Sequence, residues 1–183
     1  MNLLTILKTS MALVGLPDDE DTLELWRPKL TFWCNEALCD LGLSLRPWSR
    51  EEMTLEEGGY LYPDALYYPC IKVLGVEKEG KRFPFYYAGS ARDILIPGLK
   101  EGDTVEVVYR YMPPAIEKDW EEPQLPEGCH NLLVSYIAAK EKAQLDAGAY
   151  NVGRFSMALY EQQKQAWIKN QPGPWENRFY NML

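Results

Sequence analysis

The chain has 183 residues, a formal net charge of −8 and a single histidine, and 46% of its residues are apolar. Such a length and composition fit one folded domain with a modest insertion, and they exclude intrinsic disorder and a collagen-like fold. No apolar run is as long as a membrane helix, and the amino terminus lacks the basic start and cleavage site of a signal peptide. The acidic balance argues against binding to nucleic acid phosphates, so we expect a cytosolic protein that acts on other proteins or small molecules.

Apolar residues at three- and four-residue steps predict two helices at the start of the chain. The first covers residues 3–14 and ends at a Gly and a Pro. The acidic residues 18–21 mark the start of the second, which ends near Gly42. Pro28 lies inside the second pattern and leaves two alternatives: a helix kinked at Pro28, or a helix that begins near Arg27 with Pro28 in its first turn.

The chain changes character at Tyr60, where tyrosine and β-branched residues become frequent after a polar connector at residues 44–59. Alternating patterns and turn signals predict strands near residues 70–76, 82–87, 93–96 and 104–111. Short turn-like segments separate these strands, so we expect an antiparallel meander and not a βαβ unit.

Helical periodicity returns after Pro126 and predicts one helix to about Asp146 and another over residues 151–169. The last helix has an apolar stripe that we expect to face the core, formed by Val152, Phe155, Leu159 and Ala166.

The predicted fold class is α+β, because neither pair of helices can bury its apolar stripes alone. We expect a small helical bundle formed by the N-terminal helices, in residues 1–45, and the C-terminal helices, in residues 126–170. The antiparallel β meander, in residues 60–114, is inserted between them as a distinct lobe, and residues 171–183 form a tail.

The sequence offers few residues for catalysis or metal binding. It contains no nucleophile elbow, P-loop or dinucleotide fingerprint. Cys129 and His130 would point about 100 degrees apart on a helix, which does not suit a nucleophile and its base. A zinc site would need Cys34 and Cys39 to converge on that pair, and buried thiols are the simpler interpretation. We therefore predict no enzyme and no catalytic, cofactor-binding or metal-binding residue.

Two aromatic regions are open to more than one interpretation. The tyrosines of residues 60–111 suit a core or a protein interface, and they also suit a carbohydrate platform. In the tail, a free segment would normally be poor in large apolar residues, so we expect it to dock on its own bundle or, preferably, on a partner or neighbouring subunit. The predicted partner-binding residues are Trp175, Phe179, Tyr180, Met182 and Leu183.

Three stretches carry a family pattern: Trp33 to Gly42 (WCNEALCDLG), Val105 to Pro114 (VEVVYRYMPP) and Leu125 to Tyr136 (LPEGCHNLLVSY). They resemble, in this order, the second helix, a strand exit and the third-helix entry of the head–tail adaptor (connector, or head-completion) proteins of tailed bacteriophages. The resemblance covers roughly residues 3–167, and Pro28 and the aromatic tail depart from the family pattern.

The resemblance implies a structural protein of the virion neck, assembled in the host cytoplasm. A homo-oligomeric ring of twelve copies would bind the portal protein and the tail, or a tail-terminator or stopper protein, without a cofactor or a membrane. DNA would pass through the channel without specific binding, and acids in the wall would repel its phosphates. Our candidates for the lumen are Glu51, Glu52, Glu56, Glu57, Glu117, Glu121 and Glu122.

Two alternative functions stay open at this point. One is another structural adaptor of the neck or baseplate. The other is a carbohydrate-binding or carbohydrate-active domain that uses the tyrosine-rich β segment.

Overall fold

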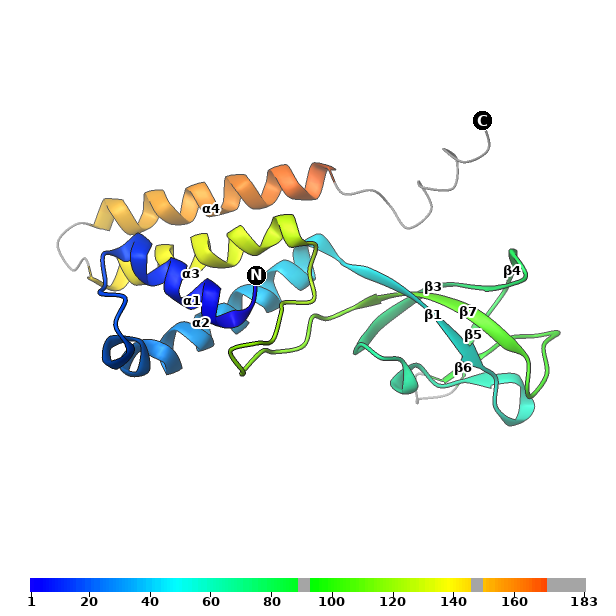
Figure 1. Ribbon diagram of the computed structural model, residues 1–183. Coiled ribbons are helices and arrows are strands. Elements are labelled where there is room, and N and C mark those ends of the chain that lie inside the picture. Colours follow the sequence, from blue (N-terminus) through cyan, green and yellow to red (C-terminus); the bar gives the residue numbers. More distant parts are fainter. Residues whose placement is uncertain (89–92, 146–149, 171–183) are drawn as a thin grey trace, which may run out of the picture. The chain divides into compact units, whose positions relative to one another are not determined.

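Figure 1 shows a computed structural model of the chain, which describes residues 1–88, 93–145 and 150–170. The chain divides into a helical unit, formed by Met1–Leu45 and Pro113–Gln171, and a β unit that starts at Arg46 and extends to Met112. The fold class is α+β, with helices at both ends of the chain and antiparallel strands between them, as predicted. Among the residues that the structure describes, no helix combines the length and the apolarity that a membrane crossing requires.

The helices of the described chain lie close to their predicted positions. They are α1 (Leu3–Val14), α2 (Glu20–Leu45), α3 (His130–Leu145) and α4 (Tyr150–Asn170), and a short 3-10 helix, η3 (Glu127–Cys129), precedes α3. The side chain of Asn2 caps α1 by accepting a hydrogen bond from the Thr5 N–H at 3.0 Å. Asp19 accepts one from the Thr22 N–H at 2.8 Å at the start of α2, and this bond lowers the pKa of Asp19.

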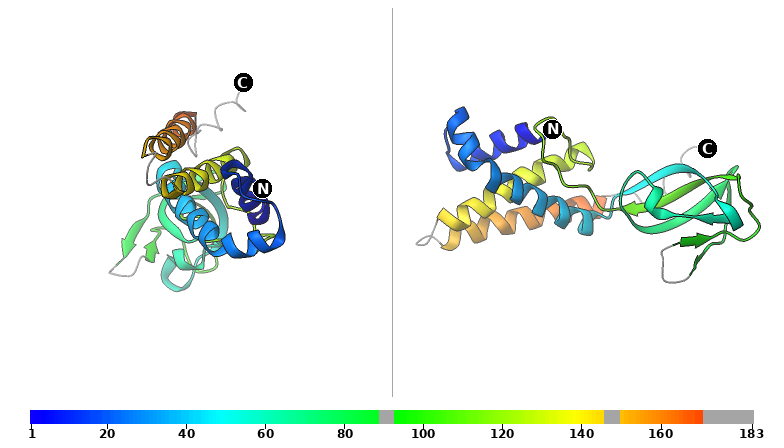
Figure 2. Two further views of the ribbon diagram at one scale, coloured as in Figure 1. Left: turned by 90° about the vertical axis from the view of Figure 1, so that its left-hand side faces the viewer. Right: turned by 90° about the horizontal axis from the view of Figure 1, so that it is seen from below.

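Pro28 lies inside α2, and the helix continues past it to Leu45. Proline has no N–H, so the carbonyl of Glu24 lacks its usual helical donor. In Figures 1 and 2 the first turns of α2 run in a different direction from the rest of the helix. The kinked helix is therefore the correct alternative, and a start near Arg27 is wrong.

The centre of the helical unit is α3, around which α1, α2 and α4 pack (Figure 2). Residues 132–134 and 136–139 of α3 are all buried. A helix that is apolar on nearly every side needs neighbours on nearly every side. The neighbours contribute fully buried side chains to the same core, among them Leu3, Ile6 and Leu7 of α1, Leu30, Leu38 and Leu41 of α2, and Tyr160 of α4.

The predicted burial of the α4 stripe is wrong. Phe155 is 72% exposed, Val152 48% and Leu159 45%, and Ala166 is exposed as well. Their spacing correctly indicated a helix, but the helix turns this side away from the core.

The side of α4 that packs inward carries a glycine and polar groups. A Cβ on Gly153 would lie 2.5 Å from Cα of Ala143, so only glycine allows α4 to lie this close to α3. Lys164 is buried, and Asp40 of α2 and Glu161 offset the cost of burying its charge by pairing with its ammonium, each at 2.8 Å. The hydroxyl of Tyr160 donates to the same Asp40. The position of α4 is thus fixed by close packing and charge pairing.

The β unit contains two sheets in the part of the chain that the structure describes. One has the order β1-β7-β3-β4 and the other β2-β6-β5, and all pairs are antiparallel, as predicted. The order is not sequential, however, because β7 lies between β1 and β3. The strands are β1 (Trp48–Thr54), β2 (Tyr60–Leu61), β3 (Cys70–Lys78), β4 (Lys81–Phe83), β5 (Tyr86–Ala88), β6 (Asp93–Leu95) and β7 (Thr104–Tyr111), with short 3-10 helices η1 (Glu57–Gly59) and η2 (Pro63–Ala65).

Two expectations for this region are corrected. Residues 44–59 are not a connector, because β1 pairs with β7 from Trp48↔Arg110 to Thr54↔Thr104. The β unit consequently begins at Arg46 and not at Tyr60. The single strand expected over residues 82–87 is divided into β4 and β5, which lie in different sheets on either side of Pro84, a residue that has no N–H for a strand ladder.

The burial of α3 predicts where a truncation will destabilise the fold. Leu133 has an exposed fraction of 0% and Leu25 of α2 one of 78%. We expect Leu133→Ala to lower the free energy of unfolding by about 2–5 kcal/mol, because it leaves a cavity. The matched control Leu25→Ala should change it by less than about 0.5 kcal/mol. Urea unfolding followed by circular dichroism measures both, and equal effects would contradict the central place of α3.

Candidate functional site

The seven predicted lumen acids fall into two groups, one in each unit. Glu51, Glu52, Glu56 and Glu57 belong to the β unit, and Glu117, Glu121 and Glu122 to the helical unit. The structure describes each group within its own unit.

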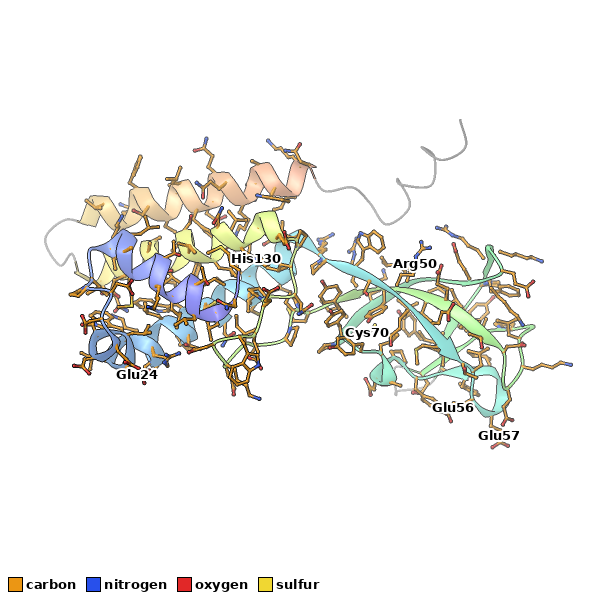
Figure 3. All side chains as sticks on the ribbon, in the orientation of Figure 1. Glu24, Arg50, Glu56, Glu57, Cys70 and His130 are labelled. Carbon is orange, nitrogen blue, oxygen red and sulfur yellow. The ribbon has the colours of Figure 1, made fainter. Side chains whose placement is uncertain are left out.

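Two of these acids accept hydrogen bonds from groups within their own units. The carboxylate of Glu51 accepts hydrogen bonds from the Tyr109 hydroxyl at 3.0 Å and from the Tyr67 N–H at 3.1 Å. Glu121 accepts from the backbone N–H groups of Lys118 and Glu117, at 3.0 and 2.7 Å, and these bonds lower its pKa. The remaining candidates are exposed, including Glu56 and Glu57, which follow β1 (Figure 3).

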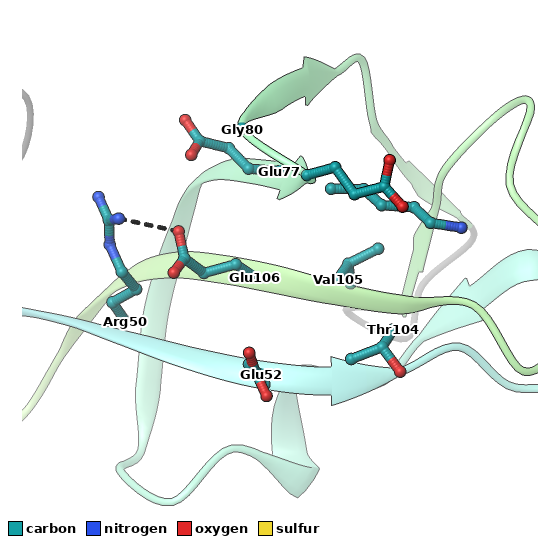
Figure 4. A pocket seen from close by; sticks show the side chains of 9 residues that line it. Arg50, Glu52, Glu77, Gly80, Thr104, Val105 and Glu106 are labelled. Atoms are coloured by element: carbon teal, nitrogen blue, oxygen red, sulfur yellow. Dashed lines mark hydrogen bonds and ion pairs between the residues drawn. The ribbon is translucent and has the colours of Figure 1, made fainter.

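The strand register aligns three glutamates across the larger sheet. Glu52 of β1 lies opposite Glu106 of β7, and Glu106 lies opposite Glu77 of β3. Residues opposite one another in an antiparallel pair share a face of the sheet, with Cβ atoms about 5 Å apart. All three line an open cavity of about 540 Å³ (Figure 4). We call Glu52, Glu106 and Glu77 the glutamate row.

Cations pair with two members of the glutamate row. Arg50 donates to Glu106 at 2.8 Å (Figure 4), and Arg82 donates to the buried Glu77 at 3.3 Å. Glu52 is exposed. The cavity is lined by four acids, Glu52, Glu77, Glu79 and Glu106, and by two bases, Arg50 and Lys78, so its wall is acidic.

Sequence reasoning named only Glu52 of this row. Glu77 directly follows the strand predicted near residues 70–76, and Glu106 lies in the strand predicted over residues 104–111, whose alternating pattern indicates a solvent face. Their adjacency depends on the register of β3, β7 and β1, and β1 lies within residues 44–59, where the sequence predicts a connector. The glutamate row could not be predicted because the pairing of these strands was not known, although the residue types were.

The tyrosines of the β unit divide between the interior and the surface. Tyr109 and Tyr111 are buried, and burial raises the pKa of each to about 12. Tyr67, Tyr86 and Tyr87 are exposed by 79%, 61% and 52%. The aromatic content of this region therefore serves both the core and an outer surface.

His130 is the first residue of α3 (Figure 3), and Cys129 precedes it as the last residue of η3. The ammonium of Met1 lies 2.8 Å from Nδ1 of His130, and the carbonyl of Leu125 lies 3.1 Å from Nε2. This arrangement assigns the neutral imidazole, with Nε2–H donating to Leu125 and Nδ1 accepting from Met1. Cys129 is fully buried, and burial raises the pKa of its thiol to about 11.

The other cysteines do not converge on this pair. Cys34 is buried, which raises the pKa of its thiol to about 12, whereas Cys39 is exposed. Among the described side chains, no three from His, Cys, Asp and Glu come together as ligands for a metal ion.

The predicted partner-binding residues Trp175, Phe179, Tyr180, Met182 and Leu183 lie outside the described residues.

These features describe an α+β protein with charged and aromatic side chains on its surface. Both kinds of side chain are common at protein–protein interfaces. A comparison with protein-family models matches residues 1–172 to the SU10 adaptor protein family. The chain belongs to this family and is a structural adaptor of bacteriophage, a component of the virion neck with partners at the head–tail junction. A search of curated proteins found no match.

The buried His130 predicts a loss of stability in mild acid. Burial, followed by the charge of the Met1 ammonium, lowers the pKa of His130 below its ordinary value of 6.5. The unfolded chain then binds a proton more readily than the folded one, so stability falls as the pH drops from about 6.5 toward the folded pKa. We expect the free energy of unfolding to decline by up to about 1.4 kcal/mol per pH unit in this window.

Urea unfolding of the wild type and His130→Gln, between about pH 7.5 and 5.5, measures this slope. The variant should be less stable at neutral pH and show a flatter profile. Asp19 and Asp103, whose pKa values lie below their ordinary 3.8, titrate outside this range. An unchanged slope in the variant would contradict the assignment to His130.

The glutamate row predicts a substitution that increases stability. Glu52→Gln removes one of two like charges that stand directly opposite each other, so it should raise the free energy of unfolding by about 0.2–1 kcal/mol. The gain should shrink in high salt. Glu56→Gln, an exposed control outside the row, should have little effect. Thermal unfolding measures both, and a destabilised Glu52→Gln would show that Glu52 is held by attraction.

Proposed function

We propose that the protein is a head–tail adaptor that assembles into a ring of twelve copies between the portal protein and the tail, or a tail-terminator or stopper protein. DNA passes through the channel of this ring without specific binding. The observation that carries the proposal is the family match over residues 1–172, which spans both the helical unit and the β unit.

The distribution of charge supports a role in DNA passage. A wall that attracted phosphates would slow the DNA, whereas an acidic wall repels it. The net charge of −8 and the acidic cavity of the β unit suit such a wall. We assign the lumen to the exposed acids Glu52, Glu56, Glu57, Glu117 and Glu122, with Glu106 added from the glutamate row. Glu51 and Glu121 orient backbone and tyrosine groups within their units.

The aromatic tail is the proposed anchor on the portal or on a neighbouring copy. The family match ends at residue 172, so Trp175 and the residues after it lie beyond the matched part of the chain. Large aromatic side chains supply much of the binding free energy at protein interfaces. We therefore assign partner binding to Trp175, Phe179, Tyr180, Met182 and Leu183.

A binding experiment with the portal protein tests this assignment. The full chain should form a complex whose mass corresponds to a ring on the portal, measured by analytical ultracentrifugation at several concentrations. A chain without residues 171–183 should keep its circular dichroism spectrum and lose the complex, because the apolar cores of the described residues are formed by side chains that precede residue 170.

A pair of full-length variants separates side chains from chain length. Replacing Trp175, Phe179 and Tyr180 by Ala should weaken binding at least tenfold, as expected for interface anchors. Replacing Gln171, Asn177 and Asn181 by Ala should leave binding within about twofold. Normal attachment of the truncated chain would overturn the role of the tail, and failure of the full chain to form a ring would overturn the proposed function.

A further inference from the structure

An apolar stripe runs along the outer side of α2. It contains Leu25, Pro28, Phe32, Cys39 and Leu43, all of which are exposed. Steps of three, four and seven residues keep these side chains on one side of the helix. Leu25 is 78% exposed, Phe32 66% and Leu43 59%, so this outer side is apolar and uncovered within the helical unit.

The outer side of α4 repeats the same pattern. Val152, Phe155, Leu159 and Ala166 follow one another at steps of three, four and seven residues, as do Leu25 to Cys39 of α2. All four are exposed, and the inward side of α4 is occupied by Gly153, Tyr160 and Lys164. The helical unit therefore carries two outer stripes of equal spacing on different helices.

The two stripes lie level with each other and run in the same direction. Asp40 of α2 binds both Tyr160 and Lys164 of α4, so Cys39 and Leu159, the neighbours of Asp40 and Tyr160, stand at the same height. Figures 1 and 2 show α4 and the part of α2 that follows its kink running the same way along the unit. A rotation about an axis parallel to these helices, applied to generate the next copy of a ring, leaves the height and direction of each stripe unchanged. The α2 stripe of one copy can therefore lie alongside the α4 stripe of the next.

The two helices also carry opposite net charges. α2 has five acids and two bases, a net charge of −3, whereas α4 has three bases and one acid, a net charge of +2. Contact between α2 helices or between α4 helices would bring like charges together. Contact between α2 and α4 brings opposite charges together, which favours the mixed pairing.

We propose that the stripe of α2 in one copy packs against the stripe of α4 in the next copy, and that this contact joins the copies of the ring. Different patches meet at such an interface, so the contact repeats from copy to copy until a rotation closes it. Packing Phe32 and Phe155 against apolar neighbours removes from water the most exposed aromatic side chains of the two stripes. This inference depends on the ring proposed above.

The exposed Cys39 permits a direct cross-linking test. In a Cys70→Ser background, Cys34 and Cys129 are buried and Cys39 is the exposed thiol of the described chain. L159C places a second thiol at the same height on α4. Mild oxidation of assembled L159C, alone at high concentration or on the portal, should give a ladder of covalent species beyond the dimer on a non-reducing gel.

The control C39S/L159C distinguishes the possible occupants. The proposed contact predicts that the ladder disappears completely in this variant. Dimers that persist would show that α4 packs against α4, and a disulfide confined to the monomer band would show a contact within one chain. Either result overturns the inference.

A second pair of variants tests the stripe without cysteine chemistry. Phe155 is 72% exposed, so F155E should leave the unfolding curve unchanged and raise the concentration for half-assembly at least tenfold. Q165E adds the same charge to α4 outside the stripe and should change that concentration less than twofold. Equal effects of the two substitutions would overturn the inference.

The mass of each sample, measured in parallel, distinguishes formation of the ring from the contact between α2 and α4. A ring with the ladder and with the F155E effect supports the contact between α2 and α4. A ring without them overturns the contact and leaves the proposed function standing. Failure of the unmodified chain to form a ring, alone or with the portal, overturns both.

Discussion

The all-round burial of α3 is the constraint on which the helical unit depends. Seven of its residues, at positions 132–134 and 136–139, are withdrawn from water, and no single neighbouring helix can cover them. α1 and α2 come from the start of the chain and α4 from its later part, so the core closes only after the whole chain has been made. Burial of apolar side chains is the dominant favourable contribution to folding. The helical unit is therefore one cooperative body, although its sequence is interrupted by the β unit.

Charge pairs set the lateral positions of the helices around α3. Lys164 of α4 reaches Asp40, and Lys140 of α3 reaches Glu36, both on α2, at 2.8 Å in each case. Lys29 of α2 pairs with the fully buried Glu141 of α3 and lies over the rings of Trp26 and Trp33. Buried charges are costly unless they are paired, so few rotations of these helices are acceptable. The pairing on α4 also turns its apolar stripe outward.

The sequence predicted the parts of the fold that follow from local rules. Periodicity and end signals located the helices within a few residues, because Gly15 and Asp19 act on their own chain neighbours. The sequence-based prediction failed where the structure of a segment depends on a partner far away in the chain. The polar segment β1 is a strand only because β7 pairs with it. Phe155 faces solvent because Gly153 and Lys164 occupy the inner side of α4. For the same reason the glutamate row could not be predicted, while the exposed position of Glu52 could.

The first and last strands of the β unit are hydrogen-bonded neighbours. Trp48 pairs with Arg110, and the Tyr111 N–H donates to the Pro47 carbonyl at 3.1 Å, so the chain enters and leaves this unit at adjacent points. For the helical unit, sixty-odd residues thus act like one short loop between α2 and Pro113, and loop closure costs little more as such an insert grows. Evolution can lengthen, shorten or exchange the insert without rebuilding the helices. One helical body can in this way be fitted to different neighbours by changes to a single internal segment.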